Sequence, residues 1–396
     1  MKIFAINSVP YGSTAKIMLG IKNLAQANGH TVQMACGYSY HPISQLKGNY
    51  YQIGGAIGKQ IHTILAKATG KNGCFSGLAT RKLIKKIKEF NPDVIHLHNI
   101  HGWFLNVPML FSFIKKEKIK VVWTLHDCWA FTGGCAHFYA VGCDKWKTGC
   151  YNCNNRKSYP SSIVDNTKKS YVQKKQWFAD VEDLTIVSPS KWLENIIKQS
   201  FLAPYKVTVI NNGINLSVFK PSDSEFRKTY DIEDKFLVLG VSYGWGYKKG
   251  IDVFESISKK LGDKYKIVLV GVDEQTEKKL GENVICIKRT DSQQKLIDIY
   301  SCADVFVNPT REDNFPTVNI EALACGTPVI TFETGGSPEI IDNSCGSVVE
   351  RNDVDGLVKE IIRVCENKVF SVHDCVARAK QFDENDRFKE YLSLFK

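Results

Sequence analysis

The feature that most constrains the fold of this chain is a repeated alternation of short apolar strands with helical segments. Residues 2–6 (KIFAI) have the pattern of a buried strand, and after a small polar loop a helical pattern covers residues 15–27. Further strands are predicted at residues 94–98 and 120–125, each after a lysine-rich helical stretch. Strands that alternate with helices in this way form parallel sheets covered by helices. The first half of the chain is therefore predicted to be one doubly wound α/β domain.

A second series of alternating elements is predicted from about Lys206, with strands that include residues 236–243 and 266–272. A chain of 396 residues is long enough for two such domains. Because ligands of parallel α/β sheets bind at the carboxyl ends of the strands, we expect the chemistry in a central cleft that both domains face. The expected parts are a first domain at 1–200, a second at 201–380, and a last helix at 381–396 that packs back on the first domain.

The composition restricts the class and the compartment of the protein. Hydrophobic residues make up 43% of the sequence and charged residues 23%, which excludes disordered, collagen-like and coiled-coil classes. No run of about 18 apolar residues occurs, and the first 36 residues have the pattern strand, loop, helix, strand instead of that of a signal peptide. We therefore expect a cytoplasmic protein, in which most of the 13 cysteines are reduced core residues.

The net charge of +11 is unevenly distributed along the chain. Residues 1–200 carry 26 basic and 10 acidic side chains, a net charge of +16, whereas residues 201–396 carry 26 and 31, a net charge of −5. This asymmetry suggests that the first half meets an anionic partner. Its basic amphipathic segments at 54–69 and 81–90 are of the type that lies on an anionic membrane surface. Ordinary surface helices with solvated lysines are the alternative interpretation.

A nucleic acid is another anionic partner that such a charge would suit. Lysines outnumber arginines 24 to 2 in residues 1–200, and this composition supplies charge but little recognition of base edges. No nucleic acid is therefore expected as a partner, and nucleic-acid binding is kept as an alternative function.

The most informative stretch is residues 308–341, in which seven residues separate Asp313 from Glu321. Asp313 follows a predicted strand, and Pro316 suits the first position of a helix. The unpaired N–H groups and the positive dipole end at a helix start bind phosphate. Glu321 lies one turn beyond Thr317 on the same face, where its carboxylate can accept the two hydroxyls of a ribose; an incidental glutamate on a capped surface helix is the alternative. The residues of this stretch predicted to bind a ligand with phosphate and ribose groups are Asp313, Asn314, Phe315, Pro316, Thr317 and Glu321.

Two adjacent lysines, Lys248 and Lys249, stand in the sequence GWGYKKG at residues 244–250. A helix is predicted to begin here, and cations at a helix N-terminus oppose the helix dipole. Their position favours an anionic ligand as partner, and a solvated helix start is the alternative interpretation.

Candidate groups of the first domain follow its predicted strands. Gly12 and Ser13 lie in the loop after the first strand, where the backbone can approach a phosphate group of a ligand. His126 follows the strand VVWTL at its carboxyl end, and His98 and Asn99 end the preceding strand, so all three are expected in the cleft. For His126 a hydrogen-bonded core histidine is the alternative interpretation.

Four cysteines, Cys135, Cys143, Cys150 and Cys153, lie within 19 residues, and the last two form a C-x2-C pair. In a cytosolic chain this cluster predicts a structural zinc site made of four thiolates. Two disulfides, an iron–sulfur cluster and reduced thiols remain alternatives, because the first two spacings exceed those usual for zinc. Such a zinc ion would order the loop beside His126 and take no part in catalysis.

Five motifs stand in a recognisable order: IHLHN at 95–99, TLHD at 124–127, VINNGIN at 209–215, GWGYKKG at 244–250, and the Asp-x7-Glu motif at 313–321. With them the chain resembles, over nearly its whole length, the retaining glycosyltransferases of family 4, in particular enzymes of capsular, colanic-acid or other exopolysaccharide assembly. The resemblance implies a GT-B fold of two Rossmann-like domains. It also implies a nucleotide-sugar donor held mainly by the second domain, an acceptor held by the first, and no catalytic metal.

The resemblance also implies roles for single residues. Asp313 stands where the family has a glutamate that contacts the transferred sugar, and Glu321 matches the glutamate that binds ribose. Lys249 matches the lysine that neutralises the diphosphate; the arginine usually found shortly before it is replaced, and Lys248 is expected to supply that charge. His126 matches the histidine that contacts the transferred sugar.

Together these inferences predict a retaining glycosyltransferase that moves a sugar from a UDP or GDP sugar to a hydroxyl of a glycan or polyprenyl-diphosphate-linked acceptor. Surface polysaccharide assembly is the expected process, and the inner face of the plasma membrane is the expected location of this peripheral protein. A GT-B epimerase or phosphorylase is the alternative enzyme. A basic zinc-containing nucleic-acid-binding protein is the alternative of another class.

Overall fold

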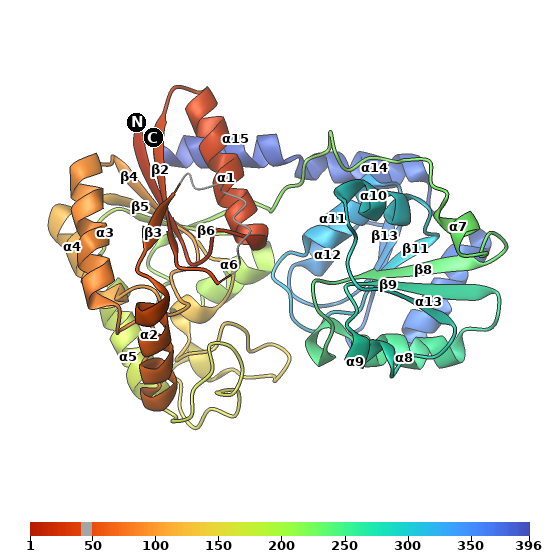
Figure 1. Ribbon diagram of the computed structural model, residues 1–396, viewed down its shortest axis with the longest axis horizontal. Coiled ribbons are helices and arrows are strands. Elements are labelled where there is room, and N and C mark those ends of the chain that lie inside the picture. The colour runs from red at the N-terminus through yellow and green to blue at the C-terminus, as the bar shows by residue number, and fades with distance from the viewer. Residues whose placement is uncertain (41–49) are drawn as a thin grey trace. The chain divides into compact units, whose positions relative to one another are not determined.

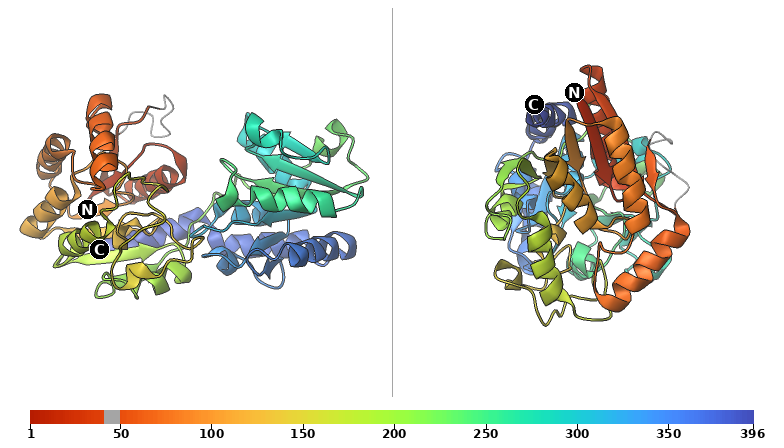
Figure 2. Two further views of the ribbon diagram at one scale, coloured as in Figure 1. Left: turned by 90° about the horizontal axis from the view of Figure 1, so that it is seen from below. Right: turned by 90° about the vertical axis from the view of Figure 1, so that its left-hand side faces the viewer.

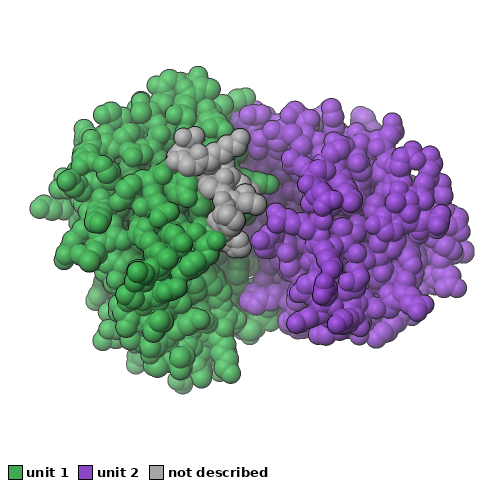
Figure 3. Space-filling view, in the orientation of Figure 1, with its two compact units in different colours: residues 1–210, 388–396 green, residues 211–387 purple. Residues whose placement is uncertain are grey.

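The computed structural model describes residues 1–40 and 50–396, and the chain divides into two compact units (Figures 1 and 3). The first unit comprises Met1–Ile210 and Phe388–Lys396, and the second comprises Asn211–Arg387. The chain therefore leaves the first unit after Ile210, where we expected the boundary at residue 200. It returns to the first unit at Phe388, within the last helix.

The first unit is a parallel sheet with helices on its faces. Its strands are β1 (Lys2–Asn7), β2 (Thr31–Gly37), β3 (Tyr51–Ile53), β4 (Val94–Leu97), β5 (Lys120–Thr124), β6 (Leu184–Ser188) and β7 (Lys206–Val209). Its helices are α1 (Gly12–Ala27), α2 (Ala56–Thr69), α3 (Gly77–Phe90), α4 (Val107–Glu117), α5 (Thr167–Phe178), α6 (Lys191–Ile197) and most of α15 (Glu384–Phe395), with the short 3-10 turns η1 (Trp129–Phe131) and η2 (Lys145–Lys147). The strand order among the described residues is β3-β2-β1-β4-β5-β6-β7, and neighbouring strands run parallel.

Strand β7 corrects one prediction. We assigned the segment that begins at Lys206 to the second series of elements, but β7 pairs in parallel with β6, with Val187 opposite Thr208. Its sequence is apolar enough for either sheet, so the pairing partner decides where it belongs. The first sheet therefore ends with β7, and the second series begins with β8.

The last helix, α15, packs back on the first unit, as predicted. Phe388, Tyr391 and Phe395 are buried in one apolar cluster with Ile17 and Ile21 of α1. The two helices approach so closely that a Cβ atom at Gly20 of α1 would lie 2.2 Å from the Phe388 ring. Burial of three aromatic side chains contributes several kcal/mol and fixes α15 on this face.

The second unit is a parallel sheet of the same kind. Its strands are β8 (Phe236–Val241), β9 (Tyr265–Val270), β10 (Val284–Ile287), β11 (Val305–Asn308), β12 (Val329–Phe332) and β13 (Gly346–Val349). Its helices are α7 (Phe226–Thr229), α8 (Ile251–Lys260), α9 (Glu274–Glu277), α10 (Gln293–Ser301), α11 (Thr317–Ala324), α12 (Ser337–Ile340), α13 (Val354–Asn367) and α14 (Val372–Ala379), with the 3-10 turns η3 (Tyr247–Lys249) and η4 (Lys380–Phe382). The strand order is β10-β9-β8-β11-β12-β13.

Both sheets contain the strand reversal of doubly wound folds. In the first sheet the order reverses between β1 and β4, and in the second between β8 and β11. Loops that leave two such strands at their carboxyl ends diverge to opposite faces and leave a crevice in which α/β proteins bind ligands. The prediction of two Rossmann-like domains is confirmed, and each unit has one switch point at which to search for a site.

Candidate active site

The switch point of the second unit brings two of the sequence motifs together. The loop after β8 contains η3 with Lys248 and Lys249, and the loop after β11 contains Asp313 and leads into α11. Because β8 and β11 are neighbours in the sheet, these two loops face each other at its carboxyl edge.

Both lysines form ion pairs with carboxylates of the opposite loop. Lys249 Nζ lies 2.7 Å from Asp313 Oδ2, and Lys248 Nζ lies 2.5 Å from Glu312 Oε2. The Glu312 side chain is buried, whereas both lysine side chains remain partly exposed. The pairs therefore hold two ammonium groups in fixed positions at the rim of the crevice, where they can also meet a second anion.

Helix α11 begins at Thr317, one residue later than we predicted, with Pro316 as its N-cap. Among the residues that the structure describes, no side chain caps this end, and the first N–H groups of a helix have no acceptors within the helix. Together with the dipole they make the start of α11 a place where phosphate oxygens bind favourably. Asn212 donates from Nδ2 to the carbonyl oxygen of Phe315 at 3.1 Å and so fixes the entry to the helix.

Glu321 lies one turn into α11 and is oriented by a buried tyrosine. The hydroxyl of Tyr300 donates a hydrogen bond of 3.2 Å to Glu321 Oε2. Burial raises the pKa of Tyr300 well above its usual value, and the charge of Glu321 raises it further. The phenol is therefore a permanent donor that positions a carboxylate able to accept hydroxyl groups.

A glycine turn after β12 packs against the Asp313 loop. Gly335 has a φ of +57°, and a Cβ atom there would lie 1.7 Å from the carbonyl oxygen of Asp313. Gly250 is similarly constrained, because its φ is +76° and a Cβ atom would lie 2.5 Å from the Pro309 carbonyl oxygen. Glycine at both positions lets three loops close around the backbone of Asp313.

Arg311 is a buried group of this site that the sequence analysis missed. Its guanidinium donates to both carboxylate oxygens of Asp252 at 2.7 Å and to the carbonyl oxygen of Tyr247 at 2.6 Å. It thereby ties α8 and the η3 turn to the Asp313 loop. Its place directly before Glu312 and Asp313 was a signal, but its partners lie about 60 residues away in sequence.

The switch point of the first unit contains the other candidate residues. Gly12, with a φ of +81°, and Ser13 begin α1 after the loop that follows β1. Buried Asn7 at the end of β1 holds this loop, because its Nδ2 donates to Thr14 Oγ1 at 3.0 Å and to the Val9 carbonyl oxygen at 3.1 Å. The glycine and the hydroxyl therefore lie where a ligand would approach the strand ends.

His98 and His126 meet beyond the ends of the adjacent strands β4 and β5. His98 Nδ1 lies 3.0 Å from His126 Nε2, and the rings stack at an interplanar angle of 6°. Burial lowers the pKa of His126 to about 4 and that of His98 well below its usual value. Both imidazoles are therefore neutral at physiological pH and act as hydrogen-bonding groups. Asn99, the other acceptor-side candidate, is partly exposed beside them.

A buried ion pair next to His126 was not foreseen. His101 Nε2 lies 2.6 Å from Asp127 Oδ2, and its Nδ1 lies 3.2 Å from the hydroxyl of Tyr159. Burial opposes ionisation of Asp127, but the charge and hydrogen bond of His101 outweigh it and lower the pKa of Asp127 to about 2. The Asp127 carboxylate also accepts a hydrogen bond of 2.9 Å from the backbone N–H of Trp129, and this bond fixes the loop that follows His126.

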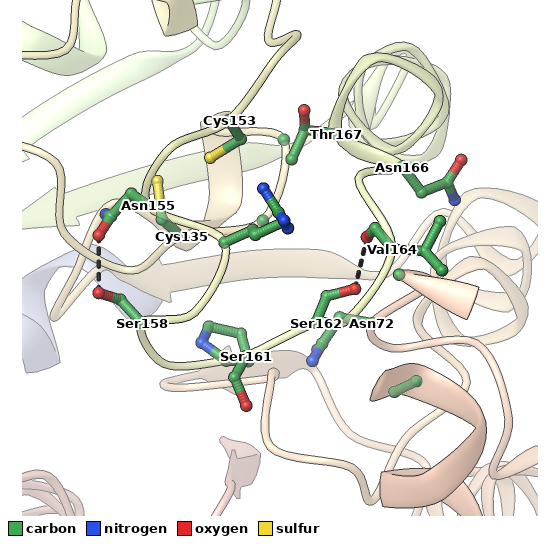
Figure 4. A pocket seen from close by; sticks show the side chains of 16 residues that line it. Asn72, Cys135, Cys153, Asn155, Ser158, Ser161, Ser162, Val164, Asn166 and Thr167 are labelled. Atoms are coloured by element: carbon green, nitrogen blue, oxygen red, sulfur yellow. Dashed lines mark hydrogen bonds between the residues drawn. The ribbon is translucent and has the colours of Figure 1, made fainter. Parts of the chain in front are cut away.

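The four cysteines predicted to bind zinc lie in the loop between η1 and α5. All four are free thiols, and all line one cavity of about 220 Å³. Figure 4 shows another pocket beside this cavity, lined in part by Cys135 and Cys153, whose sulfur atoms lie near each other. Across residues 1–40 and 50–396, no three His, Cys, Asp or Glu side chains are arranged as a ready metal site.

Solved structures resemble the whole chain. Sucrose-phosphate synthase from Thermosynechococcus elongatus superposes with a TM-score of 0.71 at 18% identity, over 100% of this chain and 98% of that one. HepE of Anabaena in complex with UDP superposes with a TM-score of 0.67 at 16% identity, over 99% and 100% of the two chains. At such identities the likeness concerns the fold, which is that of the GT-B glycosyltransferases.

Two family models cover most of the chain. The model described as Glycosyltransferase Family 4 matches residues 21–218, and the model described as Glycosyl transferases group 1 matches residues 224–387. The chain belongs to glycosyltransferase family 4, and it is a glycosyltransferase.

Its relatives include proteins of polysaccharide gene regions. The putative colanic acid biosynthesis glycosyl transferase WcaC of Escherichia coli K12 is 29% identical over 68% of this chain and 66% of its own length. An uncharacterized 41.2 kDa protein in the cps region of Klebsiella pneumoniae is 25% identical over 100% of this chain and 99% of its own length. A UDP-Gal:alpha-D-GlcNAc-diphosphoundecaprenol alpha-1,3-galactosyltransferase of Escherichia coli is 27% identical over 45% of this chain and 50% of its own length.

Proposed function

We propose that this enzyme transfers a sugar from a nucleoside diphosphate sugar, of UDP or GDP, to an acceptor hydroxyl with retention at the anomeric carbon. The observation that carries the proposal is the Lys249–Asp313 pair beside the start of α11, at the switch point of the second sheet. The difficult step of such a reaction is departure of the diphosphate. Cations and helix N–H groups held in advance where that charge develops lower its barrier.

The proposed step is a front-face displacement. The bond between the anomeric carbon and the diphosphate oxygen breaks, and its electron pair goes to that oxygen. The acceptor hydroxyl oxygen bonds to the anomeric carbon from the same face, and its proton passes to a leaving phosphate oxygen. The chain's own groups bind, orient and neutralise charge, and no enzymic nucleophile is assigned.

Each candidate residue has a proposed role. Lys248, Lys249 and the N–H groups at residues 315–318 neutralise the diphosphate, and Glu321 accepts the ribose hydroxyls. Asp313 orients the transferred sugar. The remaining donor groups are Asn314, Phe315, Pro316 and Thr317 in the second unit and Gly12 and Ser13 in the first.

In the first unit, His126 is assigned to the transferred sugar on the family resemblance. His98 and Asn99 are assigned to the acceptor. The neutral His98–His126 pair supports this use, because stacked neutral imidazoles offer hydrogen bonds to sugar hydroxyls without a charge.

We further propose a lipid-linked acceptor in surface polysaccharide assembly. WcaC is named for colanic acid biosynthesis, and the Escherichia coli galactosyltransferase is named for a diphosphoundecaprenol-linked substrate. A polyprenyl diphosphate acceptor lies in a membrane, so the enzyme must reach that surface.

Helix α2 offers a surface suited to an anionic membrane. Its side chains Ile57, Ile61 and Ile64 are 74%, 52% and 65% exposed, whereas polar His62 is completely buried. These three isoleucines therefore face outward, and Figures 1 and 2 show helix α2 at the periphery of the first unit. The first unit carries most of the excess positive charge. Apolar insertion and attraction to anionic lipids act together on such helices. Among the described residues, no helix combines the length and apolarity needed to span a bilayer.

Transfer is tested by incubating the protein with UDP or GDP sugars and a polyprenyl-diphosphate-linked sugar in detergent, with products identified by mass spectrometry and NMR. A lengthened acceptor with retained anomeric configuration supports the proposal. An inverted product overturns the retaining mechanism, and an epimerised or phosphorolysed sugar without transfer overturns the proposed reaction.

Membrane binding is tested by sedimentation with phosphatidylcholine vesicles with and without phosphatidylglycerol. We expect binding to the anionic vesicles that is lost in the Ile61→Asp/Ile64→Asp variant. Val172→Asp is the matched control, because Val172 is 50% exposed on another helix of the same unit, α5. Equal binding of all three proteins would assign the interaction elsewhere.

A further inference from the structure

We propose that Cys135, Cys143, Cys150 and Cys153 bind one zinc ion as thiolates, and that the buried ammonium of Lys174 offsets the negative charge of this site. The proposal concerns the loop between η1 and α5 and is independent of the proposed sugar donor and acceptor.

The first observation is the convergence of the four thiols. They come from three separate stretches of the loop, yet all line the cavity of about 220 Å³. All four are reduced, so no disulfide competes for the sulfur atoms. Four thiolates around one ion is the usual structural zinc site.

The loop has little else to order it. Between η1 and α5 the regular structure among its residues is the single turn η2. An aromatic stack of Phe138 and Trp146, with centroids 4.9 Å apart, lines the same cavity. Phe138 and Trp146 anchor the loop in the apolar cluster of the first unit, and a metal would add order to the rest of a loop that has one turn of regular structure.

The second observation is Lys174 of α5, which is 1% exposed. Its Nζ donates to the carbonyl oxygens of Trp129 at 2.6 Å and Thr132 at 3.1 Å, and it lies 3.6 Å from the centre of the Trp129 ring. These partners are neutral, and a buried ammonium is costly unless an anion lies close by. The nearest carboxylate that acts on it, Asp127, is already paired with His101.

Thiolates bound to a metal ion would supply that anion. Burial lowers the pKa of Lys174 to about 7, whereas negative charge on Cys135 or Cys150 would raise it. A zinc ion with four thiolates carries a net charge of −2, so a lysine beside it is stabilised and stabilises the site in return. The N–H of Gly133 donates to Cys150 Sγ at 3.1 Å, a contact that a thiolate at this position would strengthen.

In the structure the sulfur atoms line the wall of the cavity and are not gathered at coordination distances. Each sulfur moves by rotation about one Cα–Cβ bond, so binding requires changes of side-chain rotamer. Zinc binding would therefore rearrange the cysteine side chains of this loop, so zinc binding and the order of the loop are coupled.

The test is metal analysis of the full-length protein purified from zinc-supplemented cells. We expect one zinc per chain, lost in Cys150→Ser/Cys153→Ser and kept in Cys286→Ser, a partly exposed cysteine of β10. Wild type without zinc, or a double variant that keeps it, would overturn the proposal. Iron with the absorption of an iron–sulfur cluster would also overturn it.

Cobalt substitution of the wild-type protein gives a readout that does not depend on how a variant folds. The visible spectrum should be that of tetrahedral cobalt with sulfur ligands, and an octahedral spectrum would contradict the assignment. For the charge partner, Lys174→Met should release zinc to a chelator more readily, with an affinity lower by about tenfold. Unchanged affinity in this variant would remove Lys174 from the site.

Discussion

The ammonium of Lys249 lies 2.7 Å from the carboxylate of Asp313, and this pair joins the loops that leave β8 and β11. The same carboxylate is the group that we propose orients the transferred sugar, and Lys249 is the cation that we propose neutralises the diphosphate. A donor that enters the site must therefore bind to Lys249 and Asp313 while these two side chains are paired with each other.

Replacing Lys249 with Gln should lower kcat/KM for sugar transfer by about 100-fold, because a cation that stabilises the leaving diphosphate is lost. Initial rates with a saturating acceptor measure the effect. Lys259→Gln is the control, since Lys259 is an exposed lysine on α8 whose partner is Glu255. A change of less than about threefold in Lys249→Gln would contradict the assigned role.

Replacing Glu321 with Gln should weaken nucleotide binding by about 1.5–3 kcal/mol, since charge-assisted hydrogen bonds to the ribose become neutral ones. Calorimetric titration with UDP and GDP measures this loss and identifies the preferred base. Tyr300→Phe should weaken binding less, because it removes only the group that orients Glu321. If Glu321→Gln binds both nucleotides like the wild type, the ribose lies elsewhere.

Gly335→Ala should destabilise the second unit by about 2–4 kcal/mol and abolish transfer, because the added methyl group would collide with the Asp313 carbonyl oxygen at a positive φ. Thermal unfolding followed by circular dichroism measures the loss. Gly262→Ala is the matched control, since a Cβ atom at Gly262 meets nothing within 4 Å. Similar melting of the two variants would refute the close approach.

The first unit should lose stability in mild acid. Burial lowers the pKa of His62 to about 4 and that of His96 to about 3, whereas both are near 6.5 in the unfolded chain. As pH falls below 6.5 the unfolded chain binds protons first, so the stability of the folded state decreases. Each of these histidines lowers the free energy of unfolding by about 2 kcal/mol when the pH falls from about 7 to 5.

Urea unfolding at these two pH values measures the effect. The His62→Gln variant, whose amide can still bond to Ser76, should be less sensitive to acid than the wild type. The same loss of stability in both proteins would show that His62 is not the neutral buried group described. His373→Asn is the control, since His373 is highly exposed in the second unit.

The sequence predicted the strands and helices better than it predicted which strands pair with one another. Alternating strands and helices established two doubly wound units, and the family motifs placed Lys249, Asp313 and Glu321 at one strand edge. The position of β7 was wrong because its short sequence, Lys-Val-Thr-Val, suits an edge strand of either sheet, and only pairing with β6 assigns it. Local pattern fixes a strand, whereas long-range pairing fixes its sheet.

The groups that position the site were harder to foresee. Arg311 and Asp252 lie about 60 residues apart, and His101 and Asp127 lie 26 apart. Neither pair has a spacing that identifies it, because each is brought together by parallel strands and their crossover connections. For the amphipathic segment at 54–69 the sequence allowed both a membrane-facing and an ordinary surface helix, because an amphipathic pattern does not say which side faces the core.

The packing of Phe388, Tyr391 and Phe395 on α1 has a consequence for biosynthesis. When residues 1–210 have left the ribosome, these three aromatic residues have not yet been made, so Ile17 and Ile21 lack the side chains that bury them in the folded unit. Removal of residues 388–396 should therefore destabilise the unit whose other residues are synthesised first.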